Sequence, residues 1–181
     1  MIHKRALWLG WLFFCCQCAE DNLNVVFRME YPNLQVNIPA GLNTVDSHFF
    51  ILRDIPTNKS FFFGNFDENS ITEITPSAAR LDAIQNFADY AFIEEIVIRI
   101  CEDNSIFTKE DVNDRCRREI FFRDAIPFNT GSQITLIPNG NNLKSILTGD
   151  TFTLVLVLRR LRNFASTDIP SRLEMRFDAK R

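Results

Sequence analysis

Histidine, tryptophan and glycine are scarce in this chain of 181 residues, which holds 2 His, 2 Trp and 6 Gly. Zinc centres and many hydrolases depend on histidine, and His48 is the only one beyond the first few residues. The chain also lacks the Gly-x-Ser-x-Gly turn of α/β-hydrolases and the glycine-rich loops that bind phosphate. These absences predict a protein that is not an enzyme and uses no metal or cofactor. We expect His48 to be a strand residue with a hydrogen-bonded ring.

Charge and hydrophobic runs exclude further classes. A formal net charge of -3 gives no reason to expect nucleic acid as a partner. With 46% apolar residues, the chain is too hydrophobic to be disordered throughout. The apolar run Ala6–Phe14 is much shorter than the roughly 20 residues that a membrane-spanning helix needs.

The N-terminal segment has the pattern of a secretory signal, because two basic residues, Lys4 and Arg5, precede that apolar run. A buried core helix is the alternative, but it would leave both basic residues on a segment meant for the interior. We expect a signal peptide that is removed, a short tether and a single domain over 1–17, 18–24 and 25–181, respectively.

Cys15, Cys16 and Cys18 lie at the end of this signal. A signal that ends in cysteine resembles that of a bacterial lipoprotein, whose cysteine becomes the first mature residue and is acylated. We expect the acyl chains, palmitate among them, on Cys18, with Cys16 as the second choice, because polar chain begins directly after Cys18. Glu20 and Asp21 resemble the surface-export signal of Bacteroidota-type lipoproteins. The alternative, three thiols that bind a soft metal, lacks a fourth ligand nearby.

The remaining two cysteines, Cys101 and Cys116, form a natural pair. An exported protein resides in an oxidising compartment, so a disulfide is expected. It would close a loop of about 15 residues and stabilise the fold by roughly 3 kcal/mol. Two free buried thiols are the alternative.

Most of the chain consists of short stretches in which apolar and polar residues alternate, as in β-strands. Residues 151–160 are apolar on both faces, which predicts a central strand buried on both sides. The stretch 77–92 fits either a helix or a strand through Leu81–Ile84, and one helical turn is expected at Leu143–Leu147. The strand-like segments are 24–30, 34–38, 47–55, 60–64, 70–75, 92–101, 119–126, 133–137, 151–160 and 172–178.

Nine or ten short strands separated by turns predict an all-β protein. The expected architecture is an antiparallel β-sandwich, Ig-like or jelly-roll-like, with at most one short helix. The segments 70–76, 89–100 and 142–147, with the closing pair of strands, resemble small lipid-anchored β-sandwich proteins of Bacteroidota. This resemblance covers residues 70–181 and implies a fold rather than an activity.

Phenylalanines around Gly64 are candidates for contact with a partner: Phe61, Phe62, Phe63 and Phe66. Exposed phenyl groups favour protein or lipid over sugars, because they lack a polar group. A strand buried on both faces is the alternative. A glycan site would have to use Tyr31 or Tyr90, since both tryptophans lie in the expected signal.

Charged residues offer two weaker candidates. The loop between Cys101 and Cys116 is acidic enough to suggest Ca²⁺, but its spacing matches no EF-hand, and a solvated loop is the alternative. The arginines within 115–123 and 159–162 form either a basic face or ordinary salt bridges. The proposed Ca²⁺ ligands are Glu102, Asp103, Asp111 and Asp114.

Together these features predict an outer-membrane lipoprotein of the cell envelope, on the periplasmic face or the cell surface. Its partners would be the membrane, through the lipid anchor, and a protein in the outer membrane. We expect a structural or interaction role, as an accessory subunit of an outer-membrane complex. A surface adhesive or glycan-binding module is the alternative.

Overall fold

A computed structural model describes residues 24–85, 88–101 and 105–181 of the chain. Within these residues, eight strands dominate, and the helices between them are short. The strands are β1 (Val25–Ile38), β2 (His48–Pro56), β3 (Glu73–Ala83), β4 (Ile93–Cys101), β5 (Arg118–Arg123), β6 (Gln133–Pro138), β7 (Thr151–Leu161) and β8 (Ile169–Lys180). The helices are α1 (Lys59–Phe63), the 3-10 turn η1 (Glu68–Ser70), α2 (Lys109–Arg115) and α3 (Lys144–Leu147).

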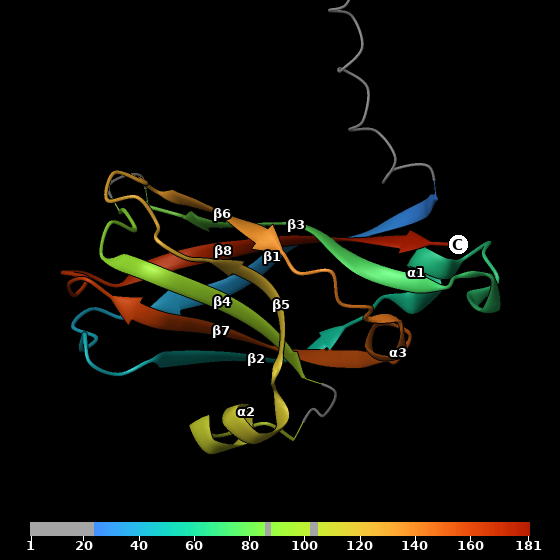
Figure 1. The fold of residues 1–181 in the computed structure, drawn as a ribbon, viewed down its shortest axis with the longest axis horizontal. Coiled ribbons are helices and arrows are strands. Elements are labelled where there is room, and N and C mark those ends of the chain that lie inside the picture. The colour runs from blue at the N-terminus through green and yellow to red at the C-terminus, as the bar shows by residue number, and fades with distance from the viewer. Residues whose placement is uncertain (1–23, 86–87, 102–104) are drawn as a thin grey trace, which may run out of the picture.

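The strands pair in the order β1-β8-β3-β6-β5-β4-β7-β2, and every pair is antiparallel. The series folds into two layers, β1-β8-β3-β6 and β5-β4-β7-β2, as Figure 1 shows. Only two residue pairs, Phe121 with Pro138 and Phe122 with Ile137, join β5 to β6 across the edge. Two four-stranded layers in this order form a jelly roll. The all-β prediction is confirmed, and the jelly-roll alternative is the one that the structure adopts.

The core lies between the two layers, where aromatic rings from one layer contact those of the other. The rings of Phe121 on β5 and Phe177 on β8 are 5.9 Å apart between centroids. Tyr31 on β1 packs edge-on against Phe152 on β7 at 5.3 Å. Such contacts add to the burial of apolar surface and fix how the layers face each other.

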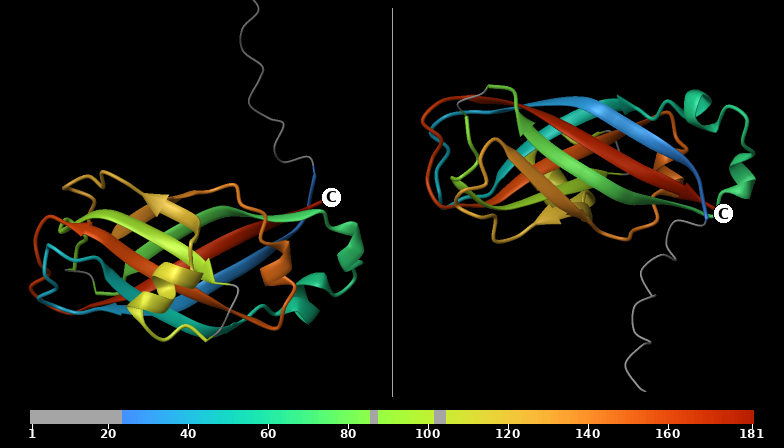
Figure 2. Two further views of the ribbon diagram at one scale, coloured as in Figure 1. Left: turned by 60° about the horizontal axis from the view of Figure 1, so that its bottom comes forward. Right: turned by 90° about the horizontal axis from the view of Figure 1, so that it is seen from above.

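Strand β7 is buried on both faces, as its double apolar pattern predicts. Leu154, Leu156 and Leu158 enter the core between the layers. Val155 and Val157 face outward and lie in a second, smaller cluster with Ile106 and Val112. These two residues belong to the chain between Cys101 and Cys116, which we call the α2 segment. Figure 2 shows α2 lying over the outside of this layer. The α2 segment therefore covers an apolar sheet face that would otherwise meet water.

The predicted disulfide is present, and it closes the α2 segment. Cys101, the last residue of β4, is bonded to Cys116, which directly follows α2, and their Cα atoms are 4.6 Å apart. Both cysteines are buried in the outer cluster. The bond joins the strand that precedes the segment to the turn that follows it.

Short helices are more frequent than the sequence suggests: α3 was expected, but α1 and α2 were not. The expected strand over 60–64 is wrong, because α1 occupies it. Helix α2 begins at a capping box. The side chain of Thr108 accepts a hydrogen bond from the backbone N–H of Asp111, and the side chain of Asp111 accepts one from the backbone N–H of Thr108. In α1, backbone hydrogen bonds from Phe61 and Phe62 to the carbonyl oxygen of Asn58 form a turn in place of the strand that the phenylalanines favour.

Two of the predicted strand boundaries also change. The ambiguous stretch 77–92 is resolved as a strand as far as Ala83, where it continues from 73 and pairs with β8 and β6. The expected strands 24–30 and 34–38 form one strand, β1, with an irregularity between Tyr31 and Leu34. Proline is tolerated there because β1 lies at the edge of its layer.

We expect replacement of both Cys101 and Cys116 by serine to lower the free energy of unfolding by about 3 kcal/mol, the value for a 15-residue loop. Urea unfolding followed by circular dichroism measures the change. A reducing agent should destabilise the natural chain to the same extent and leave the double variant unaffected. Coincident unfolding curves for the two proteins would contradict a stabilising role.

Candidate interaction surfaces

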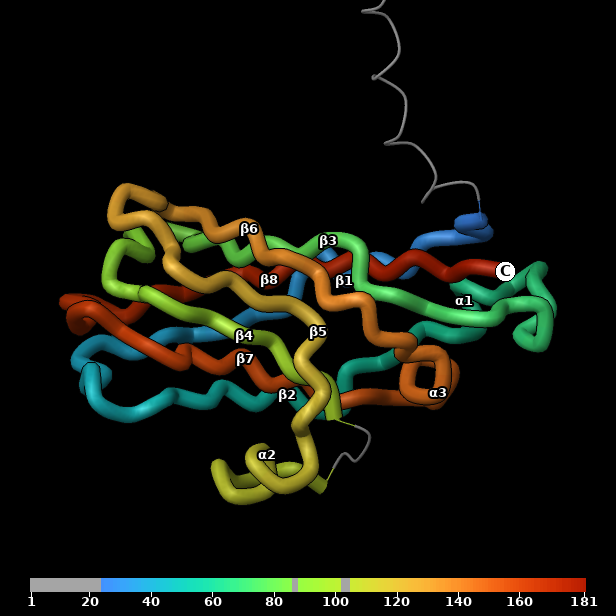
Figure 3. Tube along the Cα trace, in the orientation of Figure 1, coloured from blue at the N-terminus to red at the C-terminus, as the bar shows by residue number. Residues whose placement is uncertain are grey.

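The two poles of the jelly roll differ in what they carry. At one pole, which we call the proximal pole, β1 begins at Val25 opposite Lys180 of β8, and α1 and α3 lie close by (Figures 1 and 3). At the other pole, four loops join strands of opposite layers. We call these four loops together the distal tip. They are residues 39–47, 84–92, 124–132 and 162–168, of which 86 and 87 lie outside the described residues.

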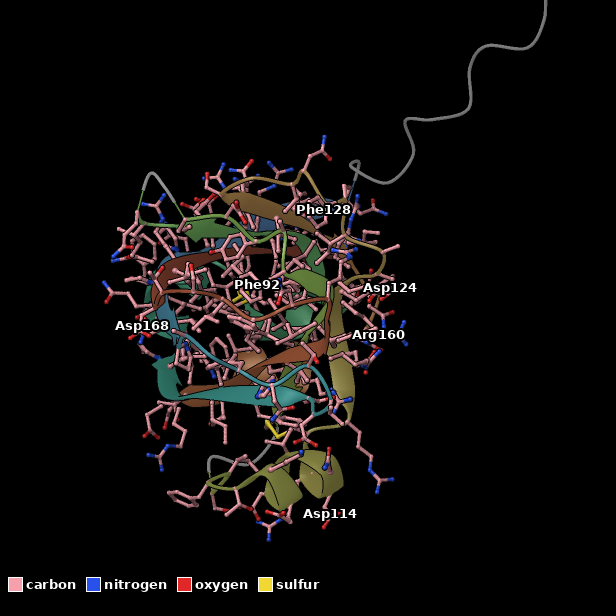
Figure 4. All side chains as sticks on the ribbon, turned by 90° about the vertical axis from the view of Figure 1, so that its left-hand side faces the viewer. Phe92, Asp114, Asp124, Phe128, Arg160 and Asp168 are labelled. Carbon is pink, nitrogen blue, oxygen red and sulfur yellow. A yellow bond between two sulfur atoms is a disulfide. The ribbon has the colours of Figure 1, made fainter. Side chains whose placement is uncertain are left out.

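Each loop of the distal tip exposes one large apolar side chain. Eight large hydrophobic residues are exposed among the described residues, and four of them lie here, one per loop. Figure 4 looks onto this pole, with Phe128 labelled. The exposed fractions are 91% for Val45, 55% for Ile84, 76% for Phe128 and 60% for Phe164. Because each loop contributes one exposed apolar residue, the apolar surface at this pole is formed by the four loops together.

Arg162 ties three of the loops together. Its Nη1 donates to the carbonyl oxygens of Ile93 at 2.6 Å and Ala91 at 3.3 Å, and its Nη2 donates to that of Ile126. The guanidinium is therefore engaged with the backbone at the ends of the loops 84–92 and 124–132. A fork of several donors suits arginine to this bridging role.

Backbone hydrogen bonds further join neighbouring loops. Gly41 donates to the carbonyl oxygen of Ala165 at 3.0 Å, and Tyr90 donates to that of Gly131 at 2.9 Å. Ala125 adopts a left-handed φ of 47°, which a β-carbon disfavours. The described part of the distal tip is thus held by contacts between loops rather than left free.

Each loop also carries one aspartate, and all four are exposed: Asp46, Asp89, Asp124 and Asp168. Arg162 is the single basic residue in these loops, so four acids against one base leave a net charge of -3. Among the described residues none of the four aspartates forms an ion pair. The loops of the distal tip therefore combine exposed apolar groups with a net negative charge.

The two tyrosines of the predicted glycan site belong to the core. The Tyr31 hydroxyl donates to the carbonyl oxygen of Thr57 at 2.9 Å, and that of Tyr90 donates to Oγ of Ser171 at 2.8 Å. Burial raises the pKa of both phenols well above their ordinary value. Within the described residues, no exposed tyrosine or tryptophan is available to stack on a sugar ring.

The four phenylalanines around Gly64 divide between core and surface. Phe63 is buried, with its ring 5.0 Å from that of Phe27, and Phe62 packs against the core from its edge. Phe66 is 38% exposed and stacks on Phe27. Phe61, which is 80% exposed on α1, is the most accessible side chain of the group.

The proposed Ca²⁺ site is only partly within the described residues, since Glu102 and Asp103 lie outside them. Asp111 is the third residue of α2 in its capping box, where the backbone N–H groups of Phe107 and Thr108 and the Thr108 hydroxyl lower its pKa. Asp114 is exposed near the end of the same helix. Over the described ranges, no three acidic, histidine or cysteine side chains gather as metal ligands.

Two arginines of the second charged candidate, Arg159 and Arg160, form salt bridges with glutamates of neighbouring strands. Arg159 pairs with Glu95 at 2.7 Å and with Glu119, which comes from a third strand. Burial alone would lower the pKa of Arg159, but hydrogen bonding to Glu95 and the two carboxylate charges raise it overall. Arg160 pairs with Glu94 at 3.5 Å. For Arg159 and Arg160 this is the alternative of ordinary salt-bridged strands, whereas Arg162 binds backbone carbonyls.

His48 begins β2, and its Nε2 lies 2.7 Å from the carbonyl oxygen of Asn43, to which it donates. The prediction of a hydrogen-bonded strand histidine is confirmed. His48 lines neither of two surface depressions at other places on the domain, one beside α3 that includes Arg118 and Lys144 and one across β3 and β8 that includes Arg176.

The predicted lipidation residues, Cys18 and its second choice Cys16, lie outside the described residues. No helix within the described ranges has the length and hydropathy to cross a membrane.

Neither a protein-family model nor a curated protein sequence matches this chain. Similar solved structures include the cyanophage Pam1 capsid asymmetric unit, with 10% identity, a TM-score of 0.34, and coverage of 91% of this chain and 93% of that one. Desmodium yellow mottle tymovirus has 12% identity and a TM-score of 0.34 over 94% and 95%. The empty head of turnip yellow mosaic virus has 10% identity and a TM-score of 0.28, with coverage of 98% of this chain and 90% of that one. At these values, the likenesses carry no conclusion about function.

Substituting Phe63 and Phe61 separately tests the division of the phenylalanine group. Phe63→Ala should lower the free energy of unfolding by about 3–5 kcal/mol, because it empties a buried aromatic position. Phe61→Ala, its exposed neighbour, should change it by less than about 1 kcal/mol. Urea unfolding of both variants measures the difference. Equal losses would contradict the assignment of Phe61 to the surface.

Replacing Arg162 by methionine should loosen the distal tip, because three backbone carbonyls lose a charged donor. We expect a loss of about 1–3 kcal/mol in the free energy of unfolding. Hydrogen exchange should become faster at the amides of Tyr90 and Ile126, whose loops Arg162 joins. Arg160→Met is the matched control, since its pair with Glu94 is exposed and contributes little. Unchanged exchange in Arg162→Met would contradict the bridging role.

Proposed function

We propose that this chain is a lipid-anchored protein of the cell envelope with a non-enzymatic, structural or protein-interaction role, as an accessory subunit of an outer-membrane complex. The observation that carries the proposal is the difference between the two ends of the domain. Strand β1 begins at the proximal pole, whereas the loops with exposed apolar residues lie at the distal tip. A domain attached at one pole leaves the other free for a partner.

The length of the expected tether supports this orientation. Cys18 precedes the first residue of β1 by seven positions, and an extended chain of that length spans at most about 25 Å. An acylated Cys18 keeps the proximal pole, with α1 and Phe61, near the membrane surface. The distal tip then points away from the membrane.

Two further features agree with an exported interaction protein. The Cys101–Cys116 disulfide suits an oxidising compartment. Exposed apolar side chains gathered at one end of a domain are typical of protein interaction sites, because leaving them in water is unfavourable. These features favour a binding role over catalysis.

We expect the full chain, expressed in its native host with a C-terminal tag, to be recovered from the membrane fraction with an acylated N-terminal Cys18. Cys18→Ala should move the protein to the soluble fraction or retain residues 1–17, because the acyl chains supply the membrane affinity. Membrane fractionation and the mass of the N-terminal peptide measure both effects.

Cys16→Ala is the matched control and should remain membrane-bound. If Cys16→Ala releases the protein and Cys18→Ala does not, Cys16 carries the lipid and the anchored role stands. Recovery of the unmodified chain from the soluble fraction with residues 1–17 intact would overturn the anchored role. A protein recovered with the natural chain in fixed proportion, and absent with Cys18→Ala, would support the accessory-subunit role.

A further inference from the structure

We propose that the distal tip is a docking surface for a protein segment that combines apolar side chains with positive charge. This inference rests on the proposed function, since it assigns the partner's chemistry to the pole that anchoring leaves free. The apolar part of this surface consists of four exposed side chains, one in each loop: Val45, Ile84, Phe128 and Phe164. The jelly-roll topology brings them to one end from positions spread over some 120 residues of chain.

The charge of the loops indicates the chemistry of the partner. Exposed Asp46, Asp89, Asp124 and Asp168 accompany the apolar residues, and each loop contributes one of them. The single arginine of these loops, Arg162, has its guanidinium directed at the carbonyls of Ala91, Ile93 and Ile126. Its donors are thus engaged within the domain. A partner with lysine or arginine beside its apolar groups is attracted to such a surface, and an acidic partner is repelled.

The same charges disfavour other occupants. An anionic lipid surface or nucleic acid would meet the aspartates with charge of the same sign. A second copy of the distal tip would do so as well. A sugar would find no exposed tyrosine or tryptophan in the described part of the loops, because Tyr90 is buried. A protein segment with apolar and basic residues suits both properties of the surface.

The described part of the distal tip is also ordered before a partner arrives. Arg162 bridges three loops, and hydrogen bonds from Gly41 to Ala165 and from Tyr90 to Gly131 join neighbouring ones. Interfaces gain affinity when the side that binds has little freedom to lose. The loops therefore present their apolar residues in a largely set arrangement.

Site-specific photo-crosslinking in the native host tests the proposal. The full chain carries p-benzoylphenylalanine in place of Phe128 or Phe164, and in place of Phe107 as a matched control. Phe107 is a phenylalanine of similar exposure, 64%, beside α2 and outside the loops of the distal tip. After irradiation, mass spectrometry locates the cross-linked peptide in the partner.

We expect Phe128 and Phe164 to cross-link to the same protein, at a segment with net positive charge and apolar residues, and Phe107 to give no such product. The double substitution Asp46→Asn and Asp124→Asn should lower the cross-link yield several-fold, and added salt should do the same in the natural chain. Circular dichroism and the unfolding midpoint verify that the double variant is folded.

Several outcomes would overturn the inference: products with lipid, glycan or another copy of this chain, an acidic partner segment, equal products from Phe107, or no protein product from either position of the distal tip. Membrane fractionation of the same cells separates the two proposals. A membrane-bound chain without these cross-links refutes the docking surface alone, whereas a soluble chain with residues 1–17 intact refutes the anchored role.

Discussion

Closure of the apolar core between two layers is the constraint on which the rest of this structure depends. Consecutive strands lie in opposite layers at every connection except the one from β4 to β5. Each connection must therefore cross the thickness of the domain, and it does so at a pole. The four loops of the distal tip are such crossings, so their position is a consequence of how the core closes. Residues far apart in the sequence meet there because their strands share a core.

The same constraint explains the α2 segment. Strand β7 occupies the interior of its layer, between β4 and β2, and has apolar residues on both faces. Its inward face joins the main core, but its outward face needs a cover of its own. The segment between Cys101 and Cys116 supplies that cover through Ile106 and Val112, and the disulfide holds both ends of the segment at the sheet. One acidic residue of this segment, Asp111, has a structural role, because it completes the capping box of α2 with Thr108.

Charged residues are paired differently on the outer faces of the strands and at the distal tip. On the outer face of one layer, arginines and glutamates of neighbouring strands pair, as Arg159 does with Glu95 and Glu119. At the distal tip the aspartates lack such partners among the described residues, while the single arginine is engaged with backbone carbonyls. The net negative charge of the loops therefore favours a partner with basic residues at the distal tip.

Local sequence pattern determined the all-β fold and the doubly buried strand over 151–160, because both depend on how apolar residues alternate or run together within one segment. The pairing of Cys101 with Cys116 followed from their being the two cysteines outside the N-terminal segment. Local pattern did not place α1 or α2. Helix α2 begins at the capping box of Thr108 and Asp111, and the turn of α1 is closed by backbone hydrogen bonds from Phe61 and Phe62 to Asn58. Nor did local pattern identify the distal tip. Val45, Ile84, Phe128 and Phe164 are far apart in the sequence, whereas the phenylalanines around Gly64 form a dense run that a sequence pattern detects. Only the tertiary structure decided which phenylalanines are core and which four distant loops share a pole, because that depends on contacts between strands that no local stretch of sequence contains.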